Sequence, residues 1–198
     1  MAVESGVAPV QYAAWGLASP ANLLTVSRIV LTPLLLWWIL AADDTIGTSW
    51  RAFILGFAMG FTDLIDGRLA RRDNNVSRLG AFLDPLADKI VVIGAGLAFV
   101  MVDRYALLPV LLIAIREIAI SAVRTWYSFK GLSIPARTSA KWKATIQGAA
   151  LLIAALPPLR DQQLVVDVAL WIAVAFTLWT GVQYLRDGST ILRTTGVR

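Results

Sequence analysis

The amino-acid sequence predicts an all-α integral membrane protein with six transmembrane helices in one domain. Of its 198 residues, 58% are hydrophobic and the mean hydropathy is +0.68, which is too apolar for an ordinary soluble domain of that length. The apolar residues form six runs, each long enough for the roughly 20 residues of helix that cross a bilayer. Short polar segments separate the runs, and most runs lack the polar face of a soluble helix.

The first expected helix, 20–41, begins at Ser19 and Pro20, an N-cap residue followed by proline at the first helical position. The other five are expected at 49–72, 80–101, 105–130, 138–156 and 164–186. Residues 20–186 then form the six-helix domain, preceded by a cytoplasmic or interfacial segment, 1–19, and followed by a cytoplasmic tail, 187–198. The first segment lacks the pattern of a secretory signal and fits a short interfacial helix and an irregular tail equally well.

Lys and Arg predict the orientation of the bundle, because these residues accumulate in cytoplasmic loops. With a cytoplasmic N-terminus, the outer side holds only Arg51, Arg104 and Arg160, and the outer loops are acidic. The basic residues of the other loops and of the C-terminal tail then face the cytoplasm. The net charge of +5 therefore favours contact with anionic headgroups and phosphorylated substrates rather than nucleic acid.

Composition also limits the available chemistry. The chain contains no Cys and no His, which excludes disulfides, thiolate chemistry and His-based metal sites. Any reaction must therefore use carboxylates, Lys, Arg, Tyr or hydroxyl groups.

Four aspartates stand where the second expected helix ends and the third begins: Asp63, Asp66, Asp84 and Asp88. Ionisable residues at membrane depth are costly, so such a cluster indicates a functional site. Asp63 and Asp66 are three residues apart, and Asp84 and Asp88 are four apart, so the two members of each pair share a helix face. Four adjacent carboxylates cannot all stay ionised without positive charge, and oxygen ligands favour Mg²⁺, Mn²⁺ or Ca²⁺. A pair of such ions can clamp a diphosphate.

These aspartates belong to a longer pattern that resembles the complete signature of the CDP-alcohol phosphatidyltransferase family. The match covers every fixed position, including the eight-residue spacer, and is much more specific than a lone glycine motif. The six-helix layout extends the resemblance over most of the chain. The pattern reads Asp63-x2-Asp66-Gly67-x2-Ala70-Arg71-x8-Gly80-x3-Asp84-x3-Asp88.

The resemblance implies a role for each position. Asp63, Asp66 and Asp84, with Asp88, form the metal-binding set for two divalent ions, Mg²⁺ or Mn²⁺, and Asp88 is also the general base. An acceptor hydroxyl attacks the lipid-side phosphorus of CDP-diacylglycerol, and CMP leaves. The family further implies a homodimer, which the small residues of the third and fourth helices permit. By the same resemblance, the CDP-lipid is bound by Asp63, Gly67, Ala70, Arg71 and Gly80.

Segments outside the signature are similar to those of bacterial phosphatidylglycerophosphate synthases, whose acceptor is glycerol 3-phosphate. They cover 22–28 with Pro33, 116–124 and 141–147. We therefore expect transfer of a phosphatidyl group to glycerol 3-phosphate at a bacterial inner membrane, with the active site facing the cytoplasm. This acceptor is a dianion that needs fixed cations, for which the candidates are Arg28, Arg116, Arg124, Arg137, Lys141 and Lys143.

Other interpretations remain open from the sequence. Within the family, a cardiolipin synthase or a member with another acceptor alcohol fits the same signature. From a different class, an ion-coupled transporter would use the four acids to coordinate its ion, although we find no inverted repeat. Lys141 and Lys143 fit interfacial anchors equally well, and Arg116 with Glu117 fits a structural ion pair.

Overall fold

The computed structural model describes residues 20–73, 78–129 and 138–195. Side chains are described in these ranges except for residues 20–22, 63–82, 84, 138–141 and 192–195. Six α-helices and one short 3₁₀-helix account for most of this part of the chain, which contains no strand. They are α1 Pro20–Leu40, α2 Trp50–Asp73, α3 Arg78–Met101, α4 Leu107–Phe129, α5 Thr138–Ala155, η1 Pro157–Leu159 and α6 Gln163–Thr195.

The all-helical prediction is confirmed, and the first five helices begin and end close to their expected bounds. The exception is α6, which continues to Thr195 instead of ending at Arg186. Two of the helices contain stretches long and apolar enough to cross a membrane, Leu23–Leu40 in α1 and Gln163–Ile191 in α6, when the described residues are searched. The charged residues of the predicted site that fall on helices lie on α1 to α5.

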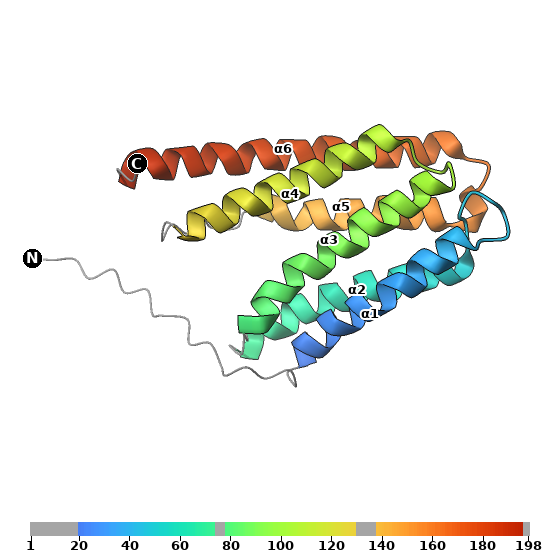
Figure 1. Cartoon of the computed structure of the whole chain (residues 1–198), viewed down its shortest axis with the longest axis horizontal. Helices are drawn as coiled ribbons and strands as arrows, with labels where there is room; N and C mark the ends of the chain where they lie inside the picture. The colour runs from blue at the N-terminus through green and yellow to red at the C-terminus, as the bar shows by residue number, and fades with distance from the viewer. Residues whose placement is uncertain (1–19, 74–77, 130–137, 196–198) are drawn as a thin grey trace, which may run out of the picture.

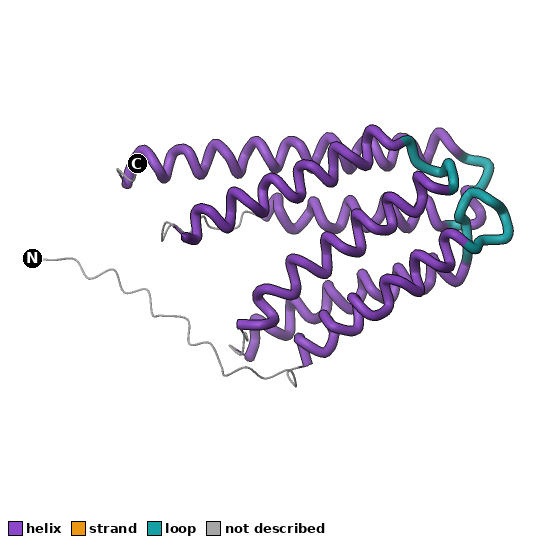
Figure 2. The backbone as a smooth tube through the Cα atoms, viewed as in Figure 1, coloured by secondary structure: helices purple, strands orange, loops and turns teal. Residues whose placement is uncertain are grey.

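The six helices run roughly side by side, and their connections gather at two ends of the bundle (Figure 1). The α1–α2, α3–α4 and α5–α6 connections lie together at one end, which we call the loop end (Figure 2). The last turns of α2 and the first turns of α3 lie at the opposite end, as do the start of α1 and the end of α6. We call this the signature end, because the acidic signature falls there.

Helix packing divides the bundle into two halves. Helix α1 packs on α2 and α3, whereas α6 packs on α4 and α5; the halves meet mainly through α3 with α4 and through α5 with α2 and α3. The buried core includes Ile39, Phe99, Ala154 and Val166, which lie toward the loop end. The halves are therefore joined at the loop end, and they separate toward the signature end (Figure 1).

Candidate active site

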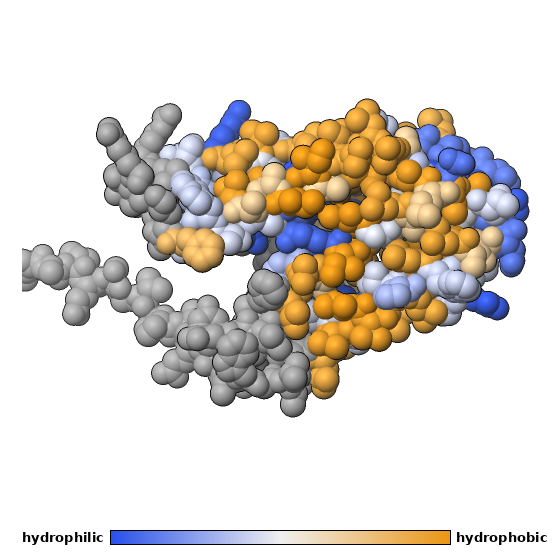
Figure 3. Space-filling model, in the orientation of Figure 1, coloured by the Kyte–Doolittle hydropathy of each residue, from blue (hydrophilic) through white to orange (hydrophobic). Residues whose placement is uncertain are grey.

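A cavity of about 350 Å³ lies between the two halves and is lined by residues of α1 to α5. Such a volume is in the range of small-molecule sites. Hydrophilic side chains are visible in the hollow between the two hydrophobic groups of helices (Figure 3). The polar part of the lining consists of Arg28, Asp88, Lys89, Arg116, Glu117, Ser121, Arg124, Lys143 and Gln147.

An ion pair joins α1 to α3 at this cavity. Arg28, which is 7% exposed, donates from Nη1 to Oδ1 of Asp88 at 2.6 Å. The Asp88 side chain is 49% exposed and lines the cavity. The close packing of α1 on α3 thus brings a predicted acceptor-binding cation to the predicted general base, although the two are far apart in the sequence.

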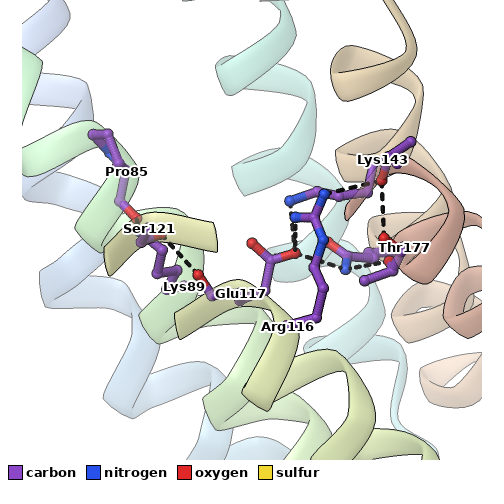
Figure 4. Close-up of polar contacts among 9 residues, drawn as sticks. Pro85, Lys89, Arg116, Glu117, Ser121, Lys143 and Thr177 are labelled. Carbon is purple, nitrogen blue, oxygen red and sulfur yellow. Dashed lines mark hydrogen bonds and ion pairs between the residues drawn. The ribbon is translucent and has the colours of Figure 1, made fainter. Parts of the chain in front are cut away.

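Glu117 on α4 is the centre of a second polar cluster, which joins α4 to α5 (Figure 4). Its Oε1 accepts hydrogen bonds from Lys143 Nζ at 2.6 Å, Arg116 Nη1 at 3.2 Å and Gln147 Nε2 at 3.2 Å. The Lys143 side chain is only 16% exposed, so the interpretation of Lys143 as an interfacial anchor is wrong. One carboxylate therefore fixes two cations, and its charge cancels only one of them.

Helix α6 supports this cluster through residues that sequence reasoning missed. Gln147 Nε2 also donates to Thr177 Oγ1 at 2.8 Å, and Arg116 Nη2 donates to Thr180 Oγ1 at 3.0 Å. A Cβ at the adjacent Gly181 would lie 3.1 Å from Arg116 Nε, so glycine leaves room for the guanidinium. The available signal was two threonines three residues apart in the otherwise apolar stretch 168–182 of α6, which places them on one face.

Arg124 contacts α6 as well as the cavity. Its guanidinium carbon lies 5.5 Å from the ring centroid of Tyr184 on α6, a cation–π contact. Arg124 still lines the cavity, so it remains available to an anionic ligand there.

The remaining predicted residues are placed by their helices alone. Asp63, Asp66, Gly67, Ala70 and Arg71 lie on α2, while Gly80 and Asp84 lie on α3 and Lys141 lies on α5. Their side chains are outside the described part of the structure, and Arg137 lies outside the described residues. Because α2 ends and α3 begins at the signature end, the backbone brings both halves of the acidic signature to the same end of the bundle (Figure 1).

The donor set of the acidic signature fits hard divalent cations. Among the side chains that the structure describes, no group of three or more His, Cys, Asp or Glu residues is placed to hold a metal. The side chains of three of the four predicted ligands, Asp63, Asp66 and Asp84, are outside the described part of the structure. Asp88, the fourth, offers a carboxylate at the cavity, and oxygen donors of this kind suit Mg²⁺ and Mn²⁺.

The charges around the cavity favour an anionic ligand. The described lining holds the cations Arg28, Lys89, Arg116, Arg124 and Lys143 against the acids Asp88 and Glu117. Enclosed by apolar helices, such an excess of one sign attracts ligands of the opposite sign and strengthens hydrogen bonds to phosphate oxygens.

Comparison with known proteins decides the family. The CDP-alcohol phosphatidyltransferase family model matches residues 18–179. The chain belongs to this family. The match includes the complete acidic signature together with α1, α4, α5 and part of α6, so Arg28, Asp88 and Glu117 lie within the matched region.

Curated family members from several bacteria are similar over most of their length. A Haemophilus influenzae protein is 33% identical over 169 residues, covering 82% of this chain and 89% of its own. A Pseudomonas fluorescens protein is 35% identical over 190 residues, covering 88% and 92%, and one from Pectobacterium atrosepticum is 36% identical over 174 residues, covering 83% and 91%. All three are named CDP-diacylglycerol–glycerol-3-phosphate 3-phosphatidyltransferase.

Proposed function

We propose that this enzyme transfers the phosphatidyl group of CDP-diacylglycerol to glycerol 3-phosphate, giving phosphatidylglycerophosphate and CMP. The single observation that carries the proposal is the cavity that joins Asp88 to a cluster of partly buried cations. The names of the similar bacterial proteins support the same donor and acceptor. Membership of a transferase family disfavours the ion-transporter interpretation.

The reaction assigns one step to Asp88. A hydroxyl of glycerol 3-phosphate attacks the lipid-side phosphorus, the new P–O bond forms, the bond to CMP breaks, and the hydroxyl proton passes to the Asp88 carboxylate. Arg28 orients that carboxylate by donating to Oδ1 at 2.6 Å. Phosphoryl transfer depends on such alignment and on charge neutralisation more than on covalent catalysis.

The acceptor phosphate requires cations that are already fixed in place. Lys143 and Arg116 meet this requirement because Glu117 and Thr180 hold them. Arg28 and Arg124 line the same cavity, and we also assign Arg137 and Lys141 to acceptor binding. Fixed cations cost less conformational entropy on binding than mobile ones.

The acidic signature is proposed to bind Mg²⁺ or Mn²⁺ through Asp63, Asp66, Asp84 and Asp88. Two such ions, when bound, supply Lewis-acid neutralisation of the donor diphosphate. We assign Asp63, Gly67, Ala70, Arg71 and Gly80 to the CDP moiety.

We further propose that all six helices cross a bacterial inner membrane, with the signature end in the cytoplasm. Both termini would then lie on that side, where Lys and Arg are concentrated. Residues 20–186 form the catalytic domain, and two copies of the chain form a homodimer.

An acceptor panel tests the function. The purified protein, in detergent with CDP-diacylglycerol and Mg²⁺ or Mn²⁺, is given glycerol 3-phosphate, phosphatidylglycerol, inositol phosphate or serine, and both CMP and lipid product are measured. We expect a lipid product, phosphatidylglycerophosphate, only when the acceptor is glycerol 3-phosphate. Cardiolipin from phosphatidylglycerol would identify a cardiolipin synthase instead, and no CMP with any acceptor would contradict the proposed activity.

A further inference from the structure

Lys89 is a cation of the cavity to which neither the sequence nor the proposed function assigns a role. It follows Asp88 on α3 and lines the cavity. Its Nζ donates to the backbone carbonyl of Pro85 on the same helix at 3.0 Å. The ammonium thus lies within one turn of the proposed general base.

The ammonium of Lys89 is held differently from the other cations of the described lining. Each of those cations contacts a carboxylate or an aromatic ring, whereas the described partner of Lys89 is a neutral carbonyl. That carbonyl is four residues back in the helix, so the backbone N–H of Lys89 itself already satisfies it. A phosphate attracts an ammonium more strongly than a neutral carbonyl does, so an anion in the cavity can displace this bond.

The packing of α3 on α4 shows which side of the cavity Lys89 faces. The two helices are consecutive and antiparallel, and their connection lies at the loop end (Figure 1). A Cβ at Gly96 on α3 would lie 3.1 Å from Val110 Cγ1 on α4, so these two residues are opposite each other. One turn nearer the signature end, Val92 and Ile113 line one small cavity between the same helices. Residues 92 and 96 are therefore on the α4-facing side of α3, and so is Lys89, three residues before 92.

The same register continues into the main cavity. One turn beyond residues 92 and 113, it places Lys89 opposite Glu117, and the following turn places Pro85 opposite Ser121. Pro85, Lys89 and Ser121 all line the cavity and appear together in Figure 4. Lys89 thus faces the helix that carries Arg116, one of the cations assigned to the acceptor phosphate.

Asp88 faces a different neighbour from Lys89. It accepts a hydrogen bond from Arg28 on α1, and successive side chains of a helix are about 100° apart. A small ligand contacts both residues if it carries a hydroxyl for Asp88 and an anionic group a few bonds away for Lys89. Glycerol 3-phosphate has this form, because a chain of three carbons separates its terminal hydroxyl from its phosphate.

We propose that Lys89 is a further acceptor-binding residue, whose ammonium leaves the Pro85 carbonyl and binds the phosphate of the acceptor while the acceptor hydroxyl reacts at Asp88. This assignment rests on the proposed function, which supplies the acceptor. Lys89 and Asp88 together then select a small alcohol with a phosphate at a fixed distance from its nucleophilic hydroxyl. An alcohol without a phosphate, such as serine, does not meet this requirement.

Substitution of Lys89 tests the proposal through the two Michaelis constants. Lys89→Met keeps the aliphatic stem and removes the charge, so we expect the KM for glycerol 3-phosphate to rise at least about tenfold, with a nearly unchanged KM for CDP-diacylglycerol. Lys89→Arg keeps the charge and should restore most of the acceptor affinity. Arg51→Met, an equal charge change at an exposed position of α2 outside the cavity, is the matched control. An unchanged KM for glycerol 3-phosphate in Lys89→Met, or equal rises in both constants, would overturn the proposal.

Chemical protection tests the same contact in the wild-type protein without turnover. The protein is incubated with Mg²⁺ and with CMP, which fills the nucleotide site, and is then acetylated briefly with acetic anhydride in the presence of glycerol 3-phosphate or of glycerol. Mass spectrometry measures acetylation of Lys89. We expect glycerol 3-phosphate to suppress this acetylation in a concentration-dependent way, whereas glycerol, which lacks the phosphate, should leave it unchanged.

The outcomes separate this proposal from the proposed function. Equal acetylation of Lys89 with glycerol 3-phosphate and with glycerol would overturn the role of Lys89, even if the same protein made phosphatidylglycerophosphate normally. Protection by CMP alone would assign Lys89 to the phosphate of the donor and would also overturn its role in acceptor binding. Absence of phosphatidylglycerophosphate in the acceptor panel would instead contradict the proposed function.

Discussion

The two ends of the bundle use polar residues in opposite ways. At the loop end, buried polar groups bond to the backbone of neighbouring segments and close the structure. At the signature end, cations and carboxylates surround a cavity. The comparison shows which polar residues this fold needs for its own stability and which it presents to a ligand.

Arg104 is the clearest example at the loop end. It is 1% exposed, and its Nη1 and Nη2 donate to the carbonyls of Arg160 at 2.8 Å and Leu159 at 2.7 Å. Nη1 also reaches the Gln163 side chain at 3.1 Å. One arginine thus supplies donors to carbonyls at the turn between α5 and α6, where the helix cannot satisfy them.

Neighbouring loop residues satisfy their polar groups in the same way. Tyr105 donates its hydroxyl to the Ala150 carbonyl at 2.7 Å, and burial raises the pKa of this phenol, so it stays protonated. Asp44 accepts hydrogen bonds from the backbone of Ile46 and Thr48 and from the Thr48 hydroxyl. Gly47 has φ +81°, a conformation that favours glycine in this turn. The loop end is therefore internally closed.

The largest expected effect is on catalysis at the signature end. Asp88→Asn removes the proposed proton acceptor at nearly constant shape, and loss of a general base lowers turnover by roughly 10²–10⁴-fold. CMP release should fall by this amount, while metal-dependent binding of CDP-diacylglycerol persists through Asp63, Asp66 and Asp84. Turnover at the wild-type rate would exclude Asp88 as the base.

The next effect is on stability at the loop end. Arg104→Ala leaves several buried carbonyls without donors, and we expect a loss of about 4 kcal/mol in the free energy of unfolding. Thermal unfolding in detergent would show it as a lower midpoint, with Arg160→Ala, at an exposed side chain, as the control. If the two variants had the same midpoint of thermal unfolding, the stabilising role of Arg104 would be refuted.

A smaller effect is expected on acceptor binding. Lys143→Met keeps the aliphatic stem but removes a charge, and one charge-assisted contact is worth about 1.5–3 kcal/mol. The KM for glycerol 3-phosphate should rise roughly 10- to 100-fold, with a much smaller change in the KM for CDP-diacylglycerol. Arg186→Met, an equal charge change at an exposed position of α6, provides the control. Equal changes in both KM values would argue against acceptor recognition by Lys143.

The smallest effect concerns the support from α6. Thr177→Val removes the hydroxyl that accepts from Gln147 at 2.8 Å, and a single neutral hydrogen bond is worth about 1 kcal/mol. We expect a roughly fivefold rise in the KM for glycerol 3-phosphate, and Thr177→Ser should restore the wild-type value. A serine variant no better than valine would show that the hydroxyl does not position Gln147.

The sequence predicted the helices well because their length and hydrophobicity are local properties. It also drew attention to Arg28, Asp88 and Lys143, which line the cavity, since charged residues in apolar helices are conspicuous. The roles of Arg104 and Thr177 depend on contacts between segments 50 or 30 residues apart, and no local pattern reveals such pairings. For the same reason, Arg104 was predicted to be an ordinary outer-loop cation, and the contact of Arg124 with Tyr184 was not predicted.

The central claim is that metal ions bind at the signature end and not at the loop end, although both ends carry aspartates. Locating bound Mn²⁺ tests this claim most directly. Anomalous diffraction from crystals grown with Mn²⁺ and CDP-diacylglycerol should place two ions between the end of α2 and the start of α3, and Asp63→Asn should weaken or remove them. Ions at the loop end, beside Asp43, Asp44, Asp103 or Asp161, or an unchanged site in Asp63→Asn, would contradict the account.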